Sequence, residues 1–130
     1  MNQFIAGIHV LVKKDNYYLV IKRSADDPED PSHWDLPGGG IDIGEQPYDA
    51  AIRETQEEAN ILINNIRPLT AWAMPFMGKW SIEVLTEAEY VSGEVKLSTE
   101  HAEYKWVTKE ELLSIEPKSK NLQAIFKISL

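Results

Sequence analysis

The sequence contains no cysteine and few basic residues. Its 130 residues include 13 Lys and Arg against 21 Asp and Glu, which gives a formal net charge of −8. Without cysteine the chain has no disulfide, no thiolate metal site and no cysteine nucleophile. The negative field disfavours binding to nucleic acid or to acidic membranes. It would also repel a polyanionic small substrate unless cations lie between substrate and protein.

Long apolar runs are also missing. No stretch approaches the ~18 residues that a membrane-spanning helix needs. Residues 1–16 have no basic segment ahead of their apolar stretch, unlike a secretory signal peptide. We therefore expect a cytoplasmic protein without a membrane partner. The length of 130 residues and the hydrophobic content of 43% predict a single domain over residues 1–130.

The apolar residues that are present fall into β-like runs. The first two, at residues 4–14 and 17–23, are separated by the turn formers Asp15 and Asn16, which predicts a hairpin. Residues 24–32 form a polar loop whose acids are interpreted as solvated surface: Asp26, Asp27, Glu29 and Asp30. Further strands are predicted at residues 61–74, 80–91 and 103–107.

Helices are predicted between and after these strands. Pro47 suits the first turn of a helix, and Asn60 tolerates the left-handed conformation that closes one. A second helix begins after Thr108, which can cap it. The tail spaces its apolar residues as one helical face: Leu122, Ile125 and Phe126. This order predicts an α/β fold of the α+β kind, a mixed sheet packed between helices.

Three glutamates lie near the end of the first predicted helix, where the helix macrodipole disfavours negative charge. Glu54, Glu57 and Glu58 follow an i, i+3, i+4 spacing, which places them on one helical face. Clustered carboxylates favour a bound hard cation such as Mg²⁺, which prefers oxygen ligands and completes its shell with water and substrate phosphate. A solvated acidic face is the alternative interpretation.

A glycine run precedes this helix. Gly38, Gly39 and Gly40 let the backbone approach a ligand closely, which makes them candidate substrate-binding residues. Glu45 and Arg53 lie at opposite ends of the loop and helix. An ion pair between these two side chains would hold the loop against the helix.

Read from residue 39 to residue 61, these features form the pattern G-x5-E-x7-R-E-x-x-E-E. Its positions are Gly39, Glu45, Arg53, Glu54, Glu57 and Glu58. The segment resembles the Nudix hydrolase signature, and the preceding W-D-L-P-G-G resembles the usual approach to it. The resemblance implies a Nudix-type α/β/α sandwich. Two positions depart from the family pattern: Asn60 stands where Gly is usual, and Thr55 where an aliphatic residue is usual.

The resemblance also implies an activity, hydrolysis of the diphosphate linkage in a nucleoside diphosphate joined to another group. Glu54, Glu57 and Glu58 would bind Mg²⁺, with Mn²⁺ possible. The Gly39 carbonyl would be a further ligand. A carboxylate would take the proton of the attacking water, and the candidate catalytic residues are Glu57, Glu54 and Glu100.

Other residues carry weaker signals. Arg23, at the end of the second strand, is placed either to reach a phosphate or to be a surface cation. His33 and His101 are interpreted as loop residues, with substrate contact as the alternative. The aromatic and methionine side chains of residues 72–80 would stack on a nucleobase, or pack in the core or in a dimer, which is the more frequent use.

The sequence therefore predicts a metal-dependent pyrophosphohydrolase whose partner is a small nucleotide, active as a monomer or homodimer. A nucleoside triphosphate is the first choice of substrate, and an ADP-sugar or dinucleoside polyphosphate is the alternative. A non-catalytic nucleotide-binding regulatory module of the same fold is the alternative from another class, and the intact glutamates argue against it. The charge of −8 disfavours RNA decapping, and the absence of cysteine disfavours isoprenoid isomerisation.

Overall fold

A mixed sheet forms the centre of the molecule in the computed structural model, which describes residues 3–130. The seven strands of this part of the chain are β1 (Phe4–Lys14), β2 (Tyr17–Arg23), β3 (Trp34–Asp35), β4 (Gly38–Gly40), β5 (Leu62–Phe76), β6 (Lys79–Ser92) and β7 (His101–Val107). The order is β3-β2-β1-β6-β5, with β4 paired to β1 and β7 paired to β2. The β1–β6 pair is parallel and the other pairs are antiparallel.

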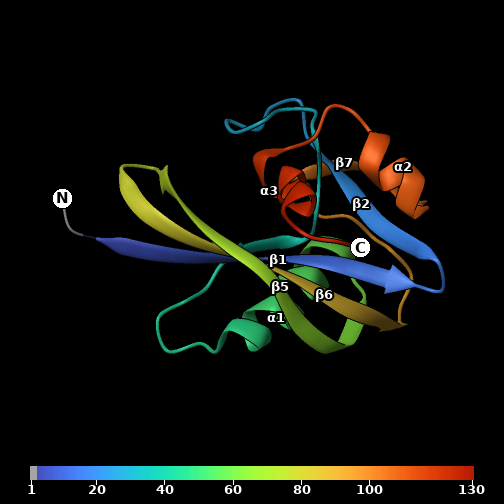
Figure 1. Ribbon diagram of the computed structural model, residues 1–130, viewed down its shortest axis with the longest axis horizontal. Coiled ribbons are helices and arrows are strands. Elements are labelled where there is room, and N and C mark those ends of the chain that lie inside the picture. The colour runs from blue at the N-terminus through green and yellow to red at the C-terminus, as the bar shows by residue number, and fades with distance from the viewer. Residues whose placement is uncertain (1–2) are drawn as a thin grey trace.

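Helices cover both faces of this sheet, as Figure 1 shows. One face carries α1 (Pro47–Ala59), whose alanines pack on β1 and β2. The other face carries α2 (Lys109–Ser114), α3 (Lys120–Gln123) and a 3-10 turn (Ala124–Lys127), which share a second core with β1, β2 and β6. The expected α/β/α sandwich with a mixed sheet is confirmed. Within the described residues, none of the helices has the length and apolarity needed to cross a membrane.

Small residues let α1 lie close to the sheet. Ala50, Ala51 and Ala59 are fully buried beneath it. The helix begins at Pro47, and Asn60 ends it with φ of 61°, in the left-handed conformation that its side chain tolerates. Asn60 therefore adopts the left-handed conformation for which glycine is usual. Its side-chain amide also donates to the Glu94 carbonyl at 3.1 Å. The bounds predicted for this helix are confirmed.

Thr55 is the second departure from the family pattern, and it gives a stability prediction. Its side chain is fully buried in α1, and its Oγ1 has no hydrogen-bond partner. A buried hydroxyl without a partner costs about 1–3 kcal/mol. Thr55→Val should therefore raise the free energy of unfolding by about 1 kcal/mol, measured as the midpoint of urea unfolding.

Thr108→Val is the matched control for that change. Thr108 Oγ1 accepts from the Glu111 backbone N–H at 3.2 Å in a capping box at the start of α2. Losing such a cap should lower the free energy of unfolding by about 1 kcal/mol. A Thr55→Val protein that unfolds at lower urea than the wild type would contradict the interpretation of Thr55.

The tail differs from the sequence-based expectation at one residue. Leu122 and Ile125 are buried, but Phe126 is 60% exposed, so the single helical face predicted for the three residues is wrong. The helix tightens into a 3-10 turn at Ala124. Three residues per turn keep Leu122 and Ile125 on one side and rotate the next residue away. Phe126 instead lies under Lys118 Nζ, 5.1 Å from the ring centroid.

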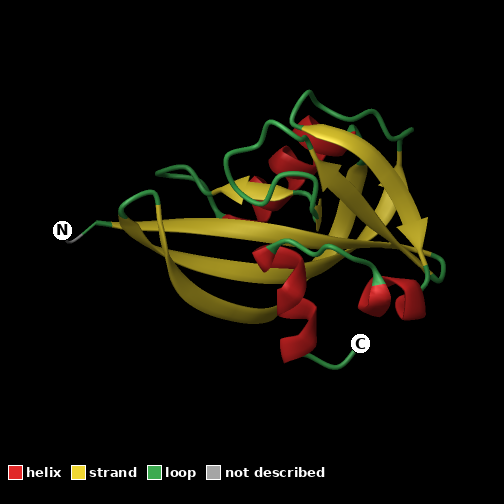
Figure 2. Ribbon diagram, turned by 90° about the horizontal axis from the view of Figure 1, so that it is seen from above, coloured by secondary structure: helices red, strands yellow, loops and turns green. Residues whose placement is uncertain are grey.

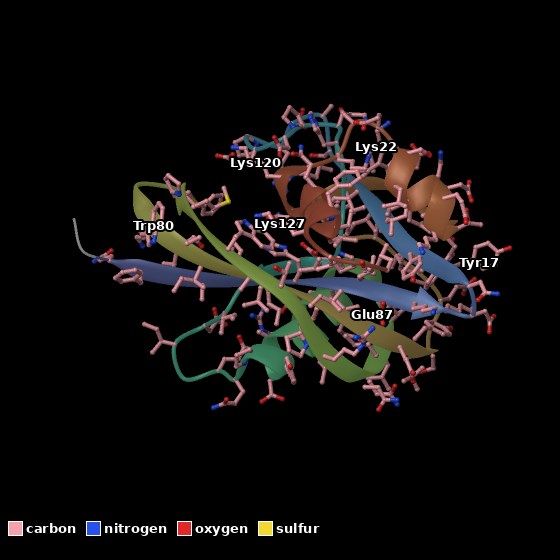
Figure 3. All side chains as sticks on the ribbon, viewed as in Figure 1. Tyr17, Lys22, Trp80, Glu87, Lys120 and Lys127 are labelled. Atoms are coloured by element: carbon pink, nitrogen blue, oxygen red, sulfur yellow. The ribbon has the colours of Figure 1, made fainter. Side chains whose placement is uncertain are left out.

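The hairpin of β5 and β6 extends beyond the helices together with the start of β1 (Figure 2). Its turn is Met77 and Gly78, both with positive φ. Figure 3 places Trp80 on this projecting end, away from the helices, and Trp80 and Met77 are exposed. The aromatic residues of segment 72–80 therefore have two different environments. Trp72 packs against the second core, while Met77 and Trp80 lie at the surface.

Candidate active site

Strand β4 and helix α1 meet at two glycines. The Gly38 backbone N–H donates to Glu58 Oε1 at 2.9 Å. A Cβ at Gly39 would lie 2.7 Å from the Glu54 side-chain carboxyl carbon, so any larger residue there would displace the Glu54 carboxylate. The glycine run thus brings bare backbone against the helix carboxylates.

The three helix glutamates lie at different depths. Glu58 is 8% exposed and lines a cavity, Glu54 is partly buried, and the Glu57 side chain is 58% exposed. The helical spacing predicts a shared face, but the depth depends on what packs against it. Glu58 lies next to the buried alanine side of α1, while Glu57 lies on the solvent side.

Arg53 connects the loop after β4 to the helix glutamates. It makes a bidentate pair with Glu45, with Nε–Oε2 and Nη2–Oε1 distances of 2.8 and 2.9 Å. It also donates to Glu54 at 2.8 Å, to Glu57 at 3.3 Å and to the Gly40 carbonyl at 3.0 Å. These contacts hold the pKa of Glu45 at about 2 and raise that of Arg53. The guanidinium fork alone can reach all of these acceptors together.

Replacing Arg53 tests this positioning. Arg53→Lys keeps the charge but loses the fork, so Glu54 and the loop should lose their fixed orientation. For the metal-dependent hydrolysis that the sequence predicts, we expect about 10- to 100-fold lower activity, the range for loss of a group that orients metal ligands. Steady-state kinetics measures it, together with the affinity for Mg²⁺.

Arg67→Lys is the control for Arg53→Lys, because Arg67 makes a 2.6 Å pair with Glu87 at the surface, outside the cavity. Its kinetics should match those of the wild type. Equal rates in both lysine variants would remove Arg53 from any positioning role.

The structure adds a second segment to the site. Ligand atoms of Glu58, Glu100 and His101 lie within 4.8 Å of one another. Backbone bonds place this segment: Ser98 N donates to the Glu58 carbonyl at 3.2 Å, and Ser24 N donates to the Glu100 carbonyl at 3.0 Å. His101, interpreted from sequence as a plain loop residue, lies within this group. His33 instead bonds the Pro31 carbonyl through Nδ1 at 2.8 Å, outside the cavity.

Burial disfavours charge on this group. It raises the pKa of Glu58 to about 9, despite the Gly38 N–H, and the nearby carboxylates of Glu54, Asp35 and Glu100 raise it further. Burial likewise raises the pKa of Glu54, against the pull of Arg53, and lowers that of His101. Buried carboxylates that lie close together disfavour one another's ionisation. A hard divalent cation bound between them would favour their charged forms, so these oxygens are suitable ligands for such an ion.

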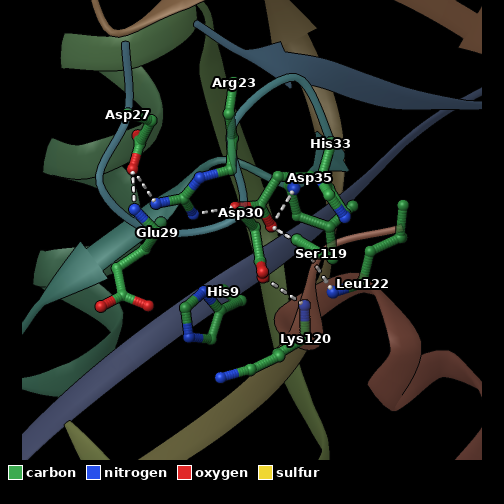
Figure 4. Close-up of polar contacts among 12 residues, drawn as sticks. His9, Arg23, Asp27, Glu29, Asp30, His33, Asp35, Ser119, Lys120 and Leu122 are labelled. Carbon is green, nitrogen blue, oxygen red and sulfur yellow. Dashed lines mark hydrogen bonds and ion pairs between the residues drawn. The ribbon is translucent and has the colours of Figure 1, made fainter. Parts of the chain in front are cut away.

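Arg23 points into the same cavity but is already paired (Figure 4). Its Nη1 lies 2.7 Å from Asp35 Oδ2, and its Nη2 lies 2.9 Å from Asp27 Oδ1. The interpretation of the 24–32 acids as solvated surface is therefore wrong for Asp27, which is drawn inward by Arg23. Asp30 also has a partner, the Lys120 backbone N–H at 3.0 Å.

The cavity itself has a volume of about 220 Å³ and runs between β4, β1 and the projecting hairpin. Sequence analysis missed several of its polar residues: His9, Asp35, Ser81, Glu83 and Lys120. A signal was present for three of them. His9 precedes Leu11, and Ser81 and Glu83 precede Leu85, at the period of two that marks one face of a strand. Polar residues that continue an apolar face indicate a site next to the core.

The fold and this site define a hydrolase of the Nudix type. The chain belongs to the NUDIX domain family, whose model matches residues 1–127.

Several relatives are similar over most of their length. The asymmetrical bis(5'-nucleosyl)-tetraphosphatase of Mus musculus is 31% identical over 112 residues, 79% of this chain and 74% of that protein. Nucleoside triphosphatase NudI of Escherichia coli O139:H28 (strain E24377A / ETEC) is 30% identical over 115 residues, 79% and 81% of the two chains. The crystal structure of MutT protein from Methanosarcina mazei Go1 is 27% identical, with a TM-score of 0.78 over 97% of this chain and 92% of that one.

Proposed function

We propose that the protein hydrolyses the diphosphate linkage of a small nucleotide, with a nucleoside triphosphate as the first choice. The observation that carries this proposal is the group of Glu58, Glu100 and His101 beside the glycine strand, at a cavity of about 220 Å³. Water adds to a phosphorus atom, the anhydride P–O bond breaks, and a nucleoside monophosphate and pyrophosphate result.

Glu54, Glu57, Glu58 and the Gly39 carbonyl are the proposed ligands of Mg²⁺ or Mn²⁺. A bound divalent ion would neutralise phosphate charge and lower the pKa of water. The buried carboxylate of Glu58, oriented by the Gly38 N–H, fits such a role best. Arg53 and Glu45 hold the loop that positions Glu54.

Glu100 is the proposed acceptor of the water proton, ahead of Glu57 and Glu54. Glu100 lies at the cavity beside Glu58, whereas Glu57 and Glu54 are both bonded to Arg53 and do not line the cavity. Lys120, which lines the cavity, is the proposed phosphate contact. Arg23 is a weaker candidate because two carboxylates already bind it. Gly38, Gly39 and Gly40 offer backbone contacts to the substrate.

A dinucleoside polyphosphate is the second candidate substrate, favoured by the similarity to the tetraphosphatase of Mus musculus. The similarity to NudI favours a nucleoside triphosphate. An ADP-sugar has no specific support from these relatives. The proposal includes a cytoplasmic location. It includes neither nucleic acid nor membrane as a partner, because the net charge is −8.

A substrate panel tests the proposal. The purified protein is incubated with nucleoside triphosphates, ADP-ribose and diadenosine tetraphosphate, with Mg²⁺, with Mn²⁺ or with EDTA. We expect metal-dependent release of pyrophosphate and a nucleoside monophosphate from at least one triphosphate. Binding of nucleotides without turnover of any of them would favour the regulatory module instead.

A further inference from the structure

Two buried polar side chains in the lining of the cavity each have one atom without a hydrogen-bond partner among the described residues. His9 is 5% exposed and Glu83 is 8% exposed, and both line the cavity. His9 Nε2 and Glu83 Oε2 have no partner within the described part of the chain. The Nε2 to Oε1 distance of 3.6 Å is too long for a hydrogen bond between them. Buried polar atoms of this kind are rare and require an explanation.

The surrounding residues fix both side chains in place. Gly7 lies opposite Glu83 in the β1–β6 register, and a Cβ there would overlap the Glu83 carboxylate. A Cβ at Gly38 would lie 2.8 Å from His9 Nδ1. Trp72 stacks on the His9 ring at a centroid distance of 5.9 Å and an angle of 22°. The pair is therefore oriented by its neighbours, with glycines leaving the room that it occupies.

We propose that Glu83 and His9 recognise the nucleobase of the substrate, and that the base they select is guanine. This rests on the proposed function for the nucleotide itself. Glu58 and Glu100 line the same cavity, so a nucleotide whose phosphates lie beside these acids leaves the rest of the lining, including the pair, for its base. Ile5, Met74 and Phe76 line the same cavity and supply apolar contacts for the faces of a ring.

The hydrogen-bonding capacities of the pair select among bases. An ionised carboxylate only accepts, and a neutral imidazole donates through one ring nitrogen. Guanine presents two adjacent N–H donors, from N1 and the 2-amino group, followed by the O6 carbonyl. Glu83 accepts both donors, and His9 donates to the carbonyl. Adenine and cytosine place an acceptor nitrogen beside their amino group, and uracil places carbonyls on both sides of its N–H. Each of these bases would therefore place a hydrogen-bond acceptor against the Glu83 carboxylate, which itself only accepts.

The Glu83→Gln variant gives the decisive test. An amide offers one acceptor and one donor, the pattern that pairs with adenine. The kcat/KM ratio of GTP to ATP should fall about 10- to 100-fold, the effect of losing hydrogen bonds to a charged group. ITP, which lacks the 2-amino group, should be a poorer substrate than GTP for the wild type and lose less in the variant. Glu89→Gln, the same change on an exposed position of β6, should leave all these ratios unchanged.

A second variant and a direct binding measurement make the test independent of catalysis. Gly7→Ala displaces the Glu83 carboxylate and should lower the GTP to ATP ratio in the same direction, with thermal melts reporting whether the variant folds. Calorimetric dissociation constants for GMP and AMP should show the same preference in the wild type, and its loss in Glu83→Gln.

The outcomes separate this inference from the proposed function. Nucleotide hydrolysis with a GTP to ATP ratio that Glu83→Gln does not change would overturn base recognition by Glu83 and leave the proposed function standing. A preference for GMP that depends on Glu83, without hydrolysis of any nucleotide, would support base recognition by Glu83 and overturn the proposed function. A wild type that prefers another base in both kinetics and binding would overturn the assignment of guanine.

Discussion

Glu58→Gln should lower turnover of the preferred nucleotide by at least about 10²-fold and leave the metal-free protein at least as stable as the wild type. A bound metal ion contributes several kcal/mol of transition-state stabilisation, which loss of a proposed ligand would reduce, and each 1.36 kcal/mol corresponds to a tenfold change in rate. The fold should tolerate the change, because Glu58 is buried with its pKa raised to about 9 and is therefore protonated near neutral pH. Gln has the shape of that neutral form and keeps an acceptor for the Gly38 N–H.

Two further variants complete the measurement. Glu57→Gln should also lower turnover strongly, because Glu57 is a proposed ligand, and should leave the fold unchanged, because its side chain is exposed. Glu110→Gln changes an exposed glutamate of α2 outside the cavity, and its kinetics should equal those of the wild type. Unchanged rates in both Glu57→Gln and Glu58→Gln would refute the ligand assignment.

Mg²⁺ should raise the melting temperature, and the increase should grow with pH. The pKa of Glu58 is raised from 4.5 to about 9 on folding, so the folded state holds more protons than the unfolded state between these values. Stability from this group is therefore present below about pH 4.5 and is lost as pH rises toward about 9. Because a cation competes with that proton, its apparent affinity should rise over the same window.

Melting curves at about pH 6 and about pH 8.5, with and without millimolar Mg²⁺, measure this coupling. At a free concentration 100 times its Kd, a ligand of the folded state stabilises by about 2.7 kcal/mol, a shift of several degrees. In Glu58→Gln the dependence of the Mg²⁺ effect on pH should disappear, because the titrating proton is gone. Melting temperatures that ignore Mg²⁺ and Mn²⁺ at every pH would count against a metal site in this cluster.

The helix and strand order could be predicted from the sequence because local chemistry determines it. The apolar, β-rich run of residues 4–14, the proline at position 47 and the asparagine at position 60 each favour a particular backbone conformation regardless of distant contacts. The packing of the C-terminal residues 122–126 is predicted less accurately. The change from α to 3-10 geometry at Ala124 rotates Phe126 outward, and periodicity alone carries no sign of that change.

The candidate site divides in the same way. The sequence by itself determined the glutamate face of α1, the glycine run and the Glu45 to Arg53 spacing, since all lie within one short segment whose geometry is local. Only the tertiary structure decided that Glu58 is deep and Glu57 exposed, that Arg23 is neutralised by Asp27 and Asp35, and that Glu83 lies beside His9. These outcomes depend on the parallel pairing of β1 with β6 and on the loop that bonds to the end of α1. A residue pattern shows which face of an element is polar, but strand pairing and packing determine what lies opposite.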